Sequence, residues 1–100
     1  MYKYKETKQA IKDWEKIRSM PKAIKEKFKY FIVEILYKPR DKNALGSPEQ
    51  LKHNEKELWS RELTKKDRIV YGIEAGENYG MPEENEIIVF YQYLGHYNDK

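Results

Sequence analysis

The residues most suited to chemistry lie between positions 47 and 71, with a further short motif near the C-terminus. Pro-Glu-Gln-Leu-Lys-His occupies residues 48–53, Trp-Ser-Arg 59–61, Arg-Ile-Val-Tyr 68–71 and Gly-His-Tyr 95–97. Metal-free cleavage of RNA needs a base for the ribose 2′-hydroxyl, a cation for the charged phosphorane and an acid for the leaving 5′-oxygen. These motifs contain a carboxylate, cationic side chains and histidines, which are the residue types that such chemistry requires.

Arg68 is the candidate for binding phosphate. Its guanidinium is a planar fork of donors that stays charged and can hold two phosphate oxygens. Apolar side chains alternate with it at positions 69, 71 and 73, so in a strand they would face the helices while Arg68 faces the opposite side. The alternative is an ordinary strand residue paired with Glu49 or Asp67.

His96 is the candidate acid, because an imidazole titrates near neutral pH and can deliver a proton. Tyr97 beside it can stack on a base or donate its hydroxyl; the alternative is a frayed tail with a solvated histidine. His53 would share a strand face with Glu49 and is interpreted either as a structural residue or as a partner that supports the site. Lys52 suits an RNA phosphate, with a solvated surface lysine as the alternative.

Arg61 and the C-terminal tyrosines allow more than one interpretation. Arg61 belongs to the Trp-Ser-Arg motif and is a candidate for RNA contact, but it shares the strand parity of Trp59 and Leu63, which points toward the core. Three tyrosines fit the core, a dimer contact or a base-stacking platform equally well: Tyr91, Tyr93 and Tyr97.

Composition indicates one folded domain over residues 1–100. Charged residues make up 37% of the chain and hydrophobic residues 39%, so the core is small, but 14% aromatic residues supply the apolar area to order it. The net charge is +3, and lysines crowd the first third of the chain. Such a surface favours a polyanionic partner, although solvated helix faces have the same pattern.

Several classes of function are disfavoured. The sequence has no Cys, no cluster of ligand-type residues at metal-binding spacing and no Gly-rich phosphate loop, so we expect neither a metal nor another cofactor. No apolar run has the length of a transmembrane helix, and the first five residues lack the apolar region of a signal peptide. The expected location is therefore cytoplasmic.

The apolar pattern predicts the elements that must position these side chains. Thr7 is a candidate N-cap for a helix that ends near Arg18, and Pro21 suits the first turn of a second, more apolar helix. The expected fold is α+β, in the order β-α-α-β-β-β, with two helices packed on one side of a twisted, mainly antiparallel sheet. Strands are expected over residues 2–6, 49–53, 58–64, 68–75 and 86–93.

In order and spacing, the four motifs resemble the RelE superfamily of toxin endoribonucleases, and within it the YoeB or Txe branch. The resemblance covers nearly the whole chain. It implies that Glu49 is the general base, and basic side chains nearby would keep this carboxylate ionised at neutral pH. The implied catalytic residues are Glu49, Arg68, His96 and Tyr97, and the implied RNA-binding residues are Lys52, His53 and Arg61.

The resemblance also implies a function and partners. The expected protein is the toxin of a type II toxin-antitoxin system, which cleaves messenger RNA in the ribosomal A site without a metal. An acidic, partly disordered antitoxin would inhibit it, and a homodimer is a further expected assembly. The alternatives are a non-catalytic module of the same fold that binds a partner protein or RNA, and a basic domain that binds acidic partners. Two departures stand out: Glu62 replaces a frequent second arginine, and residues 76–84 form a longer loop than in compact members.

Overall fold

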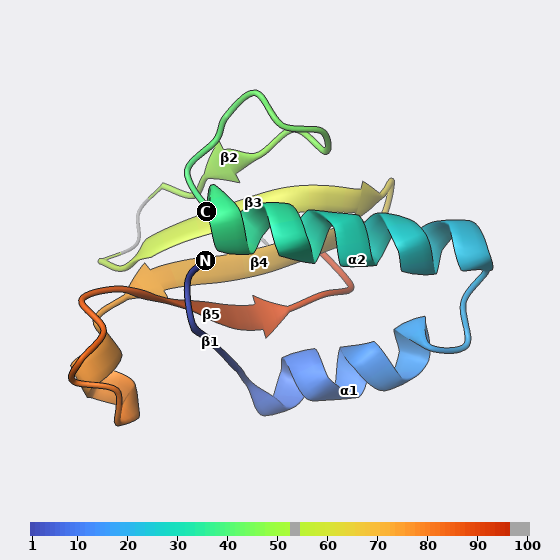
Figure 1. Ribbon diagram of the computed structural model, residues 1–100. Coiled ribbons are helices and arrows are strands. Elements are labelled where there is room, and N and C mark those ends of the chain that lie inside the picture. The colour runs from blue at the N-terminus through green and yellow to red at the C-terminus, as the bar shows by residue number, and fades with distance from the viewer. Residues whose placement is uncertain (53–54, 97–100) are drawn as a thin grey trace.

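Both helices of the computed structural model lie on one face of a five-stranded sheet, and the structure describes residues 1–52 and 55–96 (Figure 1). The strands run in the order β1-β5-β4-β3-β2 across the sheet. This arrangement confirms the expected α+β fold. The elements along the chain are β1 (Tyr4–Glu6), α1 (Lys8–Ile17), α2 (Lys22–Tyr37), β2 (Glu49–Gln50), β3 (Glu57–Thr64), β4 (Asp67–Glu74), the 3-10 helix η1 (Gly76–Tyr79) and β5 (Ile87–Gln92).

The sheet is mixed, with one parallel pair. β1 lies at an edge and runs parallel to β5, while β2 to β5 pair antiparallel, as expected of a meander. β2 forms the other edge and is shorter than predicted. Glu49 and Gln50 lie opposite Ser60 and Trp59 of β3, and the Leu51 amide donates one further bond to the Leu58 carbonyl at 2.8 Å. The part of the predicted strand that includes His53 lies outside the described residues.

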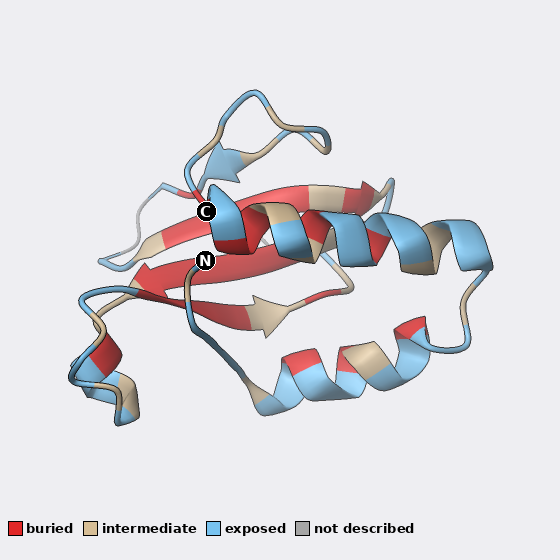
Figure 2. Cartoon of the chain, in the orientation of Figure 1, coloured by how far each residue is buried: buried red, intermediate tan, exposed pale blue. Residues whose placement is uncertain are grey.

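α1 begins directly after its predicted N-cap, whereas the proline expected in the first turn of α2 lies just before that helix. The Thr7 hydroxyl oxygen accepts a hydrogen bond from the Ala10 amide at 3.1 Å, which satisfies one of the free donors at the start of α1. Pro21 occupies the N-cap position of α2. α2 buries the face that carries Phe28, Phe31 and Ile35, and Figure 2 shows buried residues on the sheet-facing sides of both helices and along β3 to β5.

The main core lies between the helices and the sheet. In β4, Ile69, Tyr71 and Ile73 are buried in it, whereas Val70 belongs to a smaller cluster on the other face. The predicted alternation along this strand is therefore confirmed. In α1 the helical spacing of Ala10, Ile11, Trp14 and Ile17 predicts one apolar stripe, and this is wrong in one place. Ile11 is 49% exposed, whereas Asp13 is buried beside Ala10 and Ile17, at 2% exposure.

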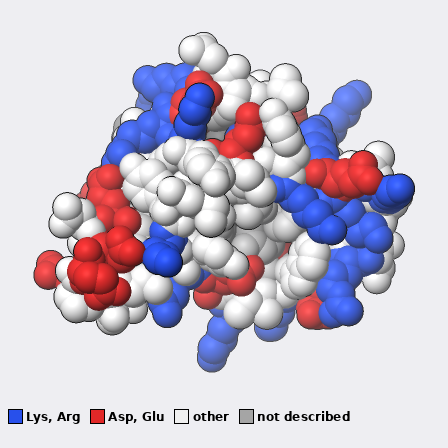
Figure 3. All heavy atoms as spheres, viewed as in Figure 1, with Lys and Arg blue, Asp and Glu red and all other residues white. Residues whose placement is uncertain are grey.

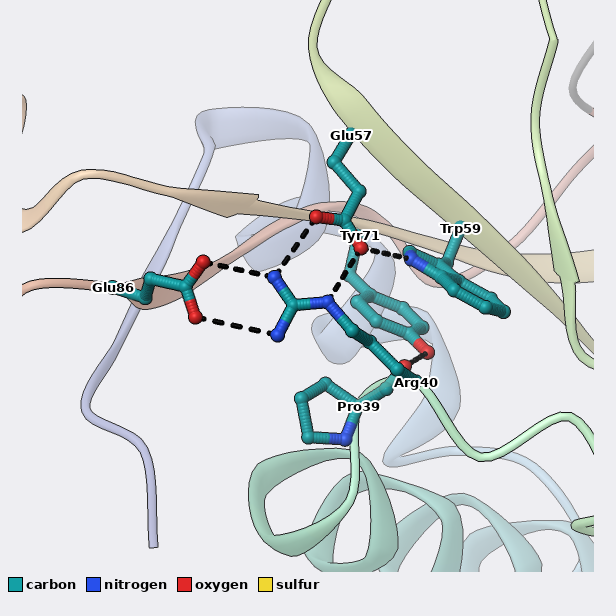
Figure 4. Close-up of polar contacts among 6 residues, drawn as sticks. All are labelled: Pro39, Arg40, Glu57, Trp59, Tyr71 and Glu86. Atoms are coloured by element: carbon teal, nitrogen blue, oxygen red, sulfur yellow. Dashed lines mark hydrogen bonds and ion pairs between the residues drawn. The ribbon is translucent and has the colours of Figure 1, made fainter.

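A polar network fastens the loop after α2 to the sheet (Figure 4). Arg40 donates two hydrogen bonds to Glu57 of β3, at 2.8 and 2.9 Å, and two to Glu86, the residue before β5, at 2.8 and 3.3 Å. The bonds from Arg40 lower the pKa of the Glu57 carboxyl. Beneath them the Tyr71 hydroxyl donates to the Pro39 carbonyl at 2.5 Å. The loop that leads to β2 thus starts from a fixed point.

Gly46 fixes the other end of this loop, and replacing it by Ala should destabilise the protein. Its φ of +87° is left-handed, and a Cβ atom would lie 2.8 Å from both the Glu62 carbonyl oxygen and the Phe31 ring. Gly80→Ala is the matched control, because Gly80 has φ +74° but nothing within 4 Å. Urea denaturation should show a loss of about 1–2 kcal/mol for Gly80→Ala, from strain alone, and a clearly larger loss for Gly46→Ala. Equal losses would contradict this explanation.

Candidate active site on the open face of the sheet

The candidate site lies on the sheet face that the helices leave uncovered, here called the open face. Residues paired across antiparallel strands point to the same side, so Glu49 of β2, Ser60 of β3 and Val70 of β4 form one row on this face. Arg68, two residues before Val70, shares their side. The strand pairing therefore brings the carboxylate and the guanidinium of the candidate site to the same face.

Arg68 and Glu49 form an ion pair held in place by Ser60. The Arg68 Nε atom donates to the buried Ser60 hydroxyl at 2.9 Å, and its Nη2 atom lies 3.7 Å from the Glu49 carboxylate. The Arg68 side chain is 23% exposed and that of Glu49 is 64% exposed. The guanidinium is therefore oriented from below by a neutral group, while the carboxylate beside it faces solvent, where a substrate hydroxyl can reach it.

The C-terminal segment returns to this site after β5. The Arg68 amide donates to the Gly95 carbonyl at 2.9 Å, and the Gly95 amide donates to the Asp67 carboxylate at 2.9 Å. Gly95 has φ +91°, a conformation that glycine adopts without strain. His96 follows directly and is exposed. The structure thus brings the backbone that carries His96 against the backbone of Arg68, whereas Tyr97 lies outside the described residues.

A hollow beside Glu49 adds a cationic residue that the sequence did not single out. It has a volume of about 520 Å³ and lies along β2. Lys52, a predicted RNA-binding residue, lines it together with Lys42 from the loop after α2. Only its position against β2 distinguishes Lys42 from the many other lysines, so the sequence alone does not indicate that Lys42 lies at the candidate site. The full lining is Lys42, Pro48, Glu49, Gln50, Leu51 and Lys52.

Arg61 lies on the opposite side of the sheet from this hollow. Its side chain is 3% exposed, its Nε atom donates to the Leu45 carbonyl at 2.6 Å, and its guanidinium pairs with Glu34 of α2. The guanidinium carbon also lies 3.9 Å from the centre of the Phe31 ring. Strand parity, and not the motif, decided its position. We therefore leave Arg61 out of the proposed RNA contacts and assign it to holding α2 on β3.

The far end of the open face carries a second polar cluster. The hydroxyls of Tyr79 and Tyr91 both donate to the Glu74 carboxylate, and the Lys56 ammonium lies 3.7 Å from it. Burial, and then the bond to Glu74, raises the pKa of Tyr91 to about 12. These contacts bind η1 to the sheet. They explain how the long segment after β4 stays packed, and they place Tyr91 on the open face and not in the main core.

Among the described residues, no group of three His, Cys, Asp or Glu side chains could hold a metal ion. Within the same ranges, no helix is long and apolar enough to cross a membrane. The open face offers a solvent-facing carboxylate and a fixed guanidinium, and the segment anchored to the Arg68 backbone carries an exposed histidine. This is a set suited to moving protons around a phosphate diester.

Comparison with known proteins finds relatives along almost the whole chain. A family model described as a YoeB-like toxin of bacterial type II toxin-antitoxin systems matches residues 6–97. No curated protein matches. Among solved structures, a YoeB/ParE toxin from Agrobacterium tumefaciens is 26% identical, with a TM-score of 0.74 over 95% of this chain and 99% of that one.

Two solved complexes share the fold. In the heterotetrameric YoeB-YefM toxin-antitoxin complex from Staphylococcus aureus, the matched chain is 21% identical, with a TM-score of 0.70 over 97% of this chain and 99% of that one. In the archaeal RelE-RelB complex from Pyrococcus horikoshii, the matched chain is 20% identical, with a TM-score of 0.65 over 94% of this chain and 93% of that one. The two-layer fold is thus that of the RelE superfamily of toxins. Within it, the chain belongs to the family of YoeB-like toxins of bacterial type II toxin-antitoxin systems.

Proposed function

We propose that this toxin is a metal-independent endoribonuclease that cleaves messenger RNA on the open face of the sheet. The proposal is carried by an ion pair on this face and by the hydrogen bond that ties the C-terminal segment to it. Glu49 pairs with Arg68 across β2 and β4, and the segment that bears His96 is bonded to the Arg68 backbone. A base, a phosphate-binding cation and an acid are the minimum for RNA cleavage without a metal.

The proposed reaction assigns the steps of cleavage to individual residues. Glu49 accepts the proton of the ribose 2′-hydroxyl, and the resulting alkoxide attacks the adjacent phosphorus. Arg68 binds the non-bridging oxygens, where negative charge increases in the transition state. His96, as imidazolium, donates its proton to the 5′-oxygen as the P–O bond breaks. The products are a 2′,3′-cyclic phosphate and a 5′-hydroxyl. Lys52 binds a neighbouring phosphate, and Tyr97 packs against a base or supports proton transfer.

Expression of the chain alone, followed by mapping of messenger RNA ends, tests the proposal. New internal 5′ ends should appear in a translating extract. If cleavage needs the ribosomal A site, they should be absent when translation is blocked before the messenger is loaded. Ends that appear equally in both extracts would contradict ribosome dependence alone. No new ends in either extract would favour a non-catalytic module that binds a partner protein or RNA.

An antitoxin is the proposed partner, as in the two solved toxin-antitoxin complexes. The solvent face of α2 carries a stripe of large exposed side chains at helical spacing, Tyr30, Val33 and Tyr37, which are 52–61% exposed. Basic side chains gather on the helix face where α1 and α2 meet, whereas acidic ones cover the η1 segment (Figure 3). An acidic segment that folds along α2 would match both the apolar stripe and the basic side chains at the end of the helix nearest α1.

We expect Val33→Glu to weaken antitoxin binding by at least about tenfold, because it places a charge within the apolar contact that offsets the partner's ordering cost. Ile11→Glu on α1 is the matched control, since Ile11 is exposed to a similar extent. The wild-type complex should survive salt well above the physiological level, because apolar contact is not screened. Dissociation at moderate salt, or equal weakening by both variants, would contradict this binding mode.

A further inference from the structure

Three polar side chains hold the segment between β5 and His96: Asp13 of α1, Asp67 of β4 and Gln92 of β5. We propose that these three residues, here called the C-terminal clamp, act as positioning residues that hold His96 beside Arg68 for proton transfer. The inference rests on the proposed function of the site. None of the three was a candidate from the sequence, and none belongs to the proposed proton-transfer groups.

Asp13 is the buried end of the clamp. Its Oδ2 atom accepts the backbone amides of Tyr93 and Leu94, at 2.9 and 3.2 Å, and its Oδ1 atom accepts from Gln9 at 2.8 Å. The residue is 2% exposed, on a helix face that otherwise buries apolar side chains. A carboxylate is costly there unless it is hydrogen-bonded. The carboxylate accepts hydrogen bonds from the backbone amides of the first two residues after β5.

Gln92 and Asp67 hold the segment from the site side. The Gln92 amide nitrogen lies 3.3, 3.0 and 3.2 Å from the carbonyl oxygens of Arg68, Leu94 and Gly95. Asp67 accepts the Gly95 amide through one oxygen and the Thr64 hydroxyl through the other, at 2.9 and 2.7 Å. Gln92 therefore joins the Arg68 backbone directly to the two residues that precede His96.

The clamp determines how well a terminal histidine can act as an acid. A segment with free ends samples many conformations, and ordering it for each reaction would raise the barrier. A misplacement of about 1 Å can cost about 10²-fold in rate. By fixing residues 93–95 in advance, the clamp leaves His96 only its own torsions to adjust. Loss of the clamp should lower kcat with little change in KM, because the contacts of Arg68 and Lys52 with RNA remain.

A double-mutant cycle with His96→Gln tests this role. Gln92 is only partly buried, so the Gln92→Ala variant should fold. Gln92→Ala and Asp13→Ala should each lower kcat by about tenfold. Asp13→Asn keeps an acceptor oxygen and should therefore lower kcat less than Asp13→Ala. Combined with His96→Gln, the same changes should cost no more than about a further twofold, because the group they position is gone. Tyr79→Phe, which removes a partly buried hydrogen bond to Glu74 at the far end of the open face, is the control and should leave kcat near the wild-type value.

Hydrogen exchange gives a readout that does not depend on RNA cleavage. In the wild type, the amides of residues 93–95 should exchange slowly, and Gln92→Ala or Asp13→Ala should accelerate them while amides within α2 stay unchanged. Unchanged exchange at 93–95, or full additivity with His96→Gln, would overturn the clamp. Slow exchange in a wild type that cleaves no RNA would instead contradict the proposed function, and would leave the clamp as a purely structural device.

Discussion

Glu49→Gln and His96→Gln should each lower RNA cleavage by about 10²- to 10⁴-fold, the usual contribution of a positioned acid or base. Both replacements are close in size and shape to the original side chains, and both residues are exposed, so the fold should persist. Single-turnover cleavage of a defined RNA measures the effect, with circular dichroism and thermal unfolding to confirm folding. The loss should lie in the chemical step and not in RNA binding.

Two controls separate chemistry from charge and from residue type. Glu62 of β3 lies opposite Arg68 of β4, so Glu62→Gln removes a second carboxylate that lies close to Arg68. It should not reduce cleavage, because it removes a charge that repels RNA. His53→Gln removes the other histidine and should have a smaller effect than His96→Gln. If His53→Gln proved the most damaging, the two histidines would exchange roles. Near-unchanged cleavage by both Glu49→Gln and His96→Gln would end the acid-base assignment.

Arg68→Lys should lower cleavage by about 10²-fold or more although it keeps the charge. Lysine cannot reproduce the fork that binds two phosphate oxygens, and it lacks the Nε–H that donates to Ser60. Loss of a single fixed donor at a developing negative charge typically costs about 10²- to 10³-fold. RNA binding should weaken much less, which can be measured with an RNA that carries a 2′-deoxy nucleotide at the cleavage site.

Lys42→Ala is the comparison for Arg68→Lys. Lys42 lines the hollow beside Glu49, so loss of its charge should weaken RNA binding and make that binding less dependent on salt. The cleavage rate at saturating RNA should be nearly unchanged. The two variants thus separate stabilisation of the transition state from general attraction to the RNA backbone. Wild-type cleavage by Arg68→Lys would show that the site needs only a positive charge.

The fold could be predicted from the sequence because it depends on local periodicity. The step of two along β4 set which side Ile69 and Tyr71 face, and Thr7 marked the start of α1. β2 was predicted too long, since an edge strand keeps only the residues that its one neighbour pairs, here Glu49 and Gln50 with one further bond from Leu51. Such pairing is not encoded in the apolar pattern of the segment itself.

The site was predictable only where chemistry and strand parity agree. For Arg68, residue type and strand parity both predict a place on the open face. For Arg61, the motif predicts RNA contact and the parity predicts the core, and the side chain lies in the core. The clamp could not be predicted, because Asp13 lies 80 residues from Tyr93 in the sequence. Nothing in the helical pattern of α1 indicates that a buried carboxylate will meet two backbone amides. For the same reason Lys42 became distinctive only once the loop after α2 was seen beside β2.

Cleavage of a defined RNA by the purified toxin in excess EDTA tests the central claim most directly. If the free protein is inactive, ribosomes are added whose Mg²⁺ has first been replaced by polyamine. Two substrates are compared, which differ only by a 2′-deoxy nucleotide at the cleavage site. Attack by the 2′-hydroxyl with Glu49, Arg68 and His96 predicts that the all-ribose RNA is cleaved to 2′,3′-cyclic phosphate and 5′-hydroxyl ends and that the deoxy RNA remains intact. Cleavage of the deoxy RNA at the same bond, or 5′-phosphate ends from either substrate, would contradict the proposed mechanism.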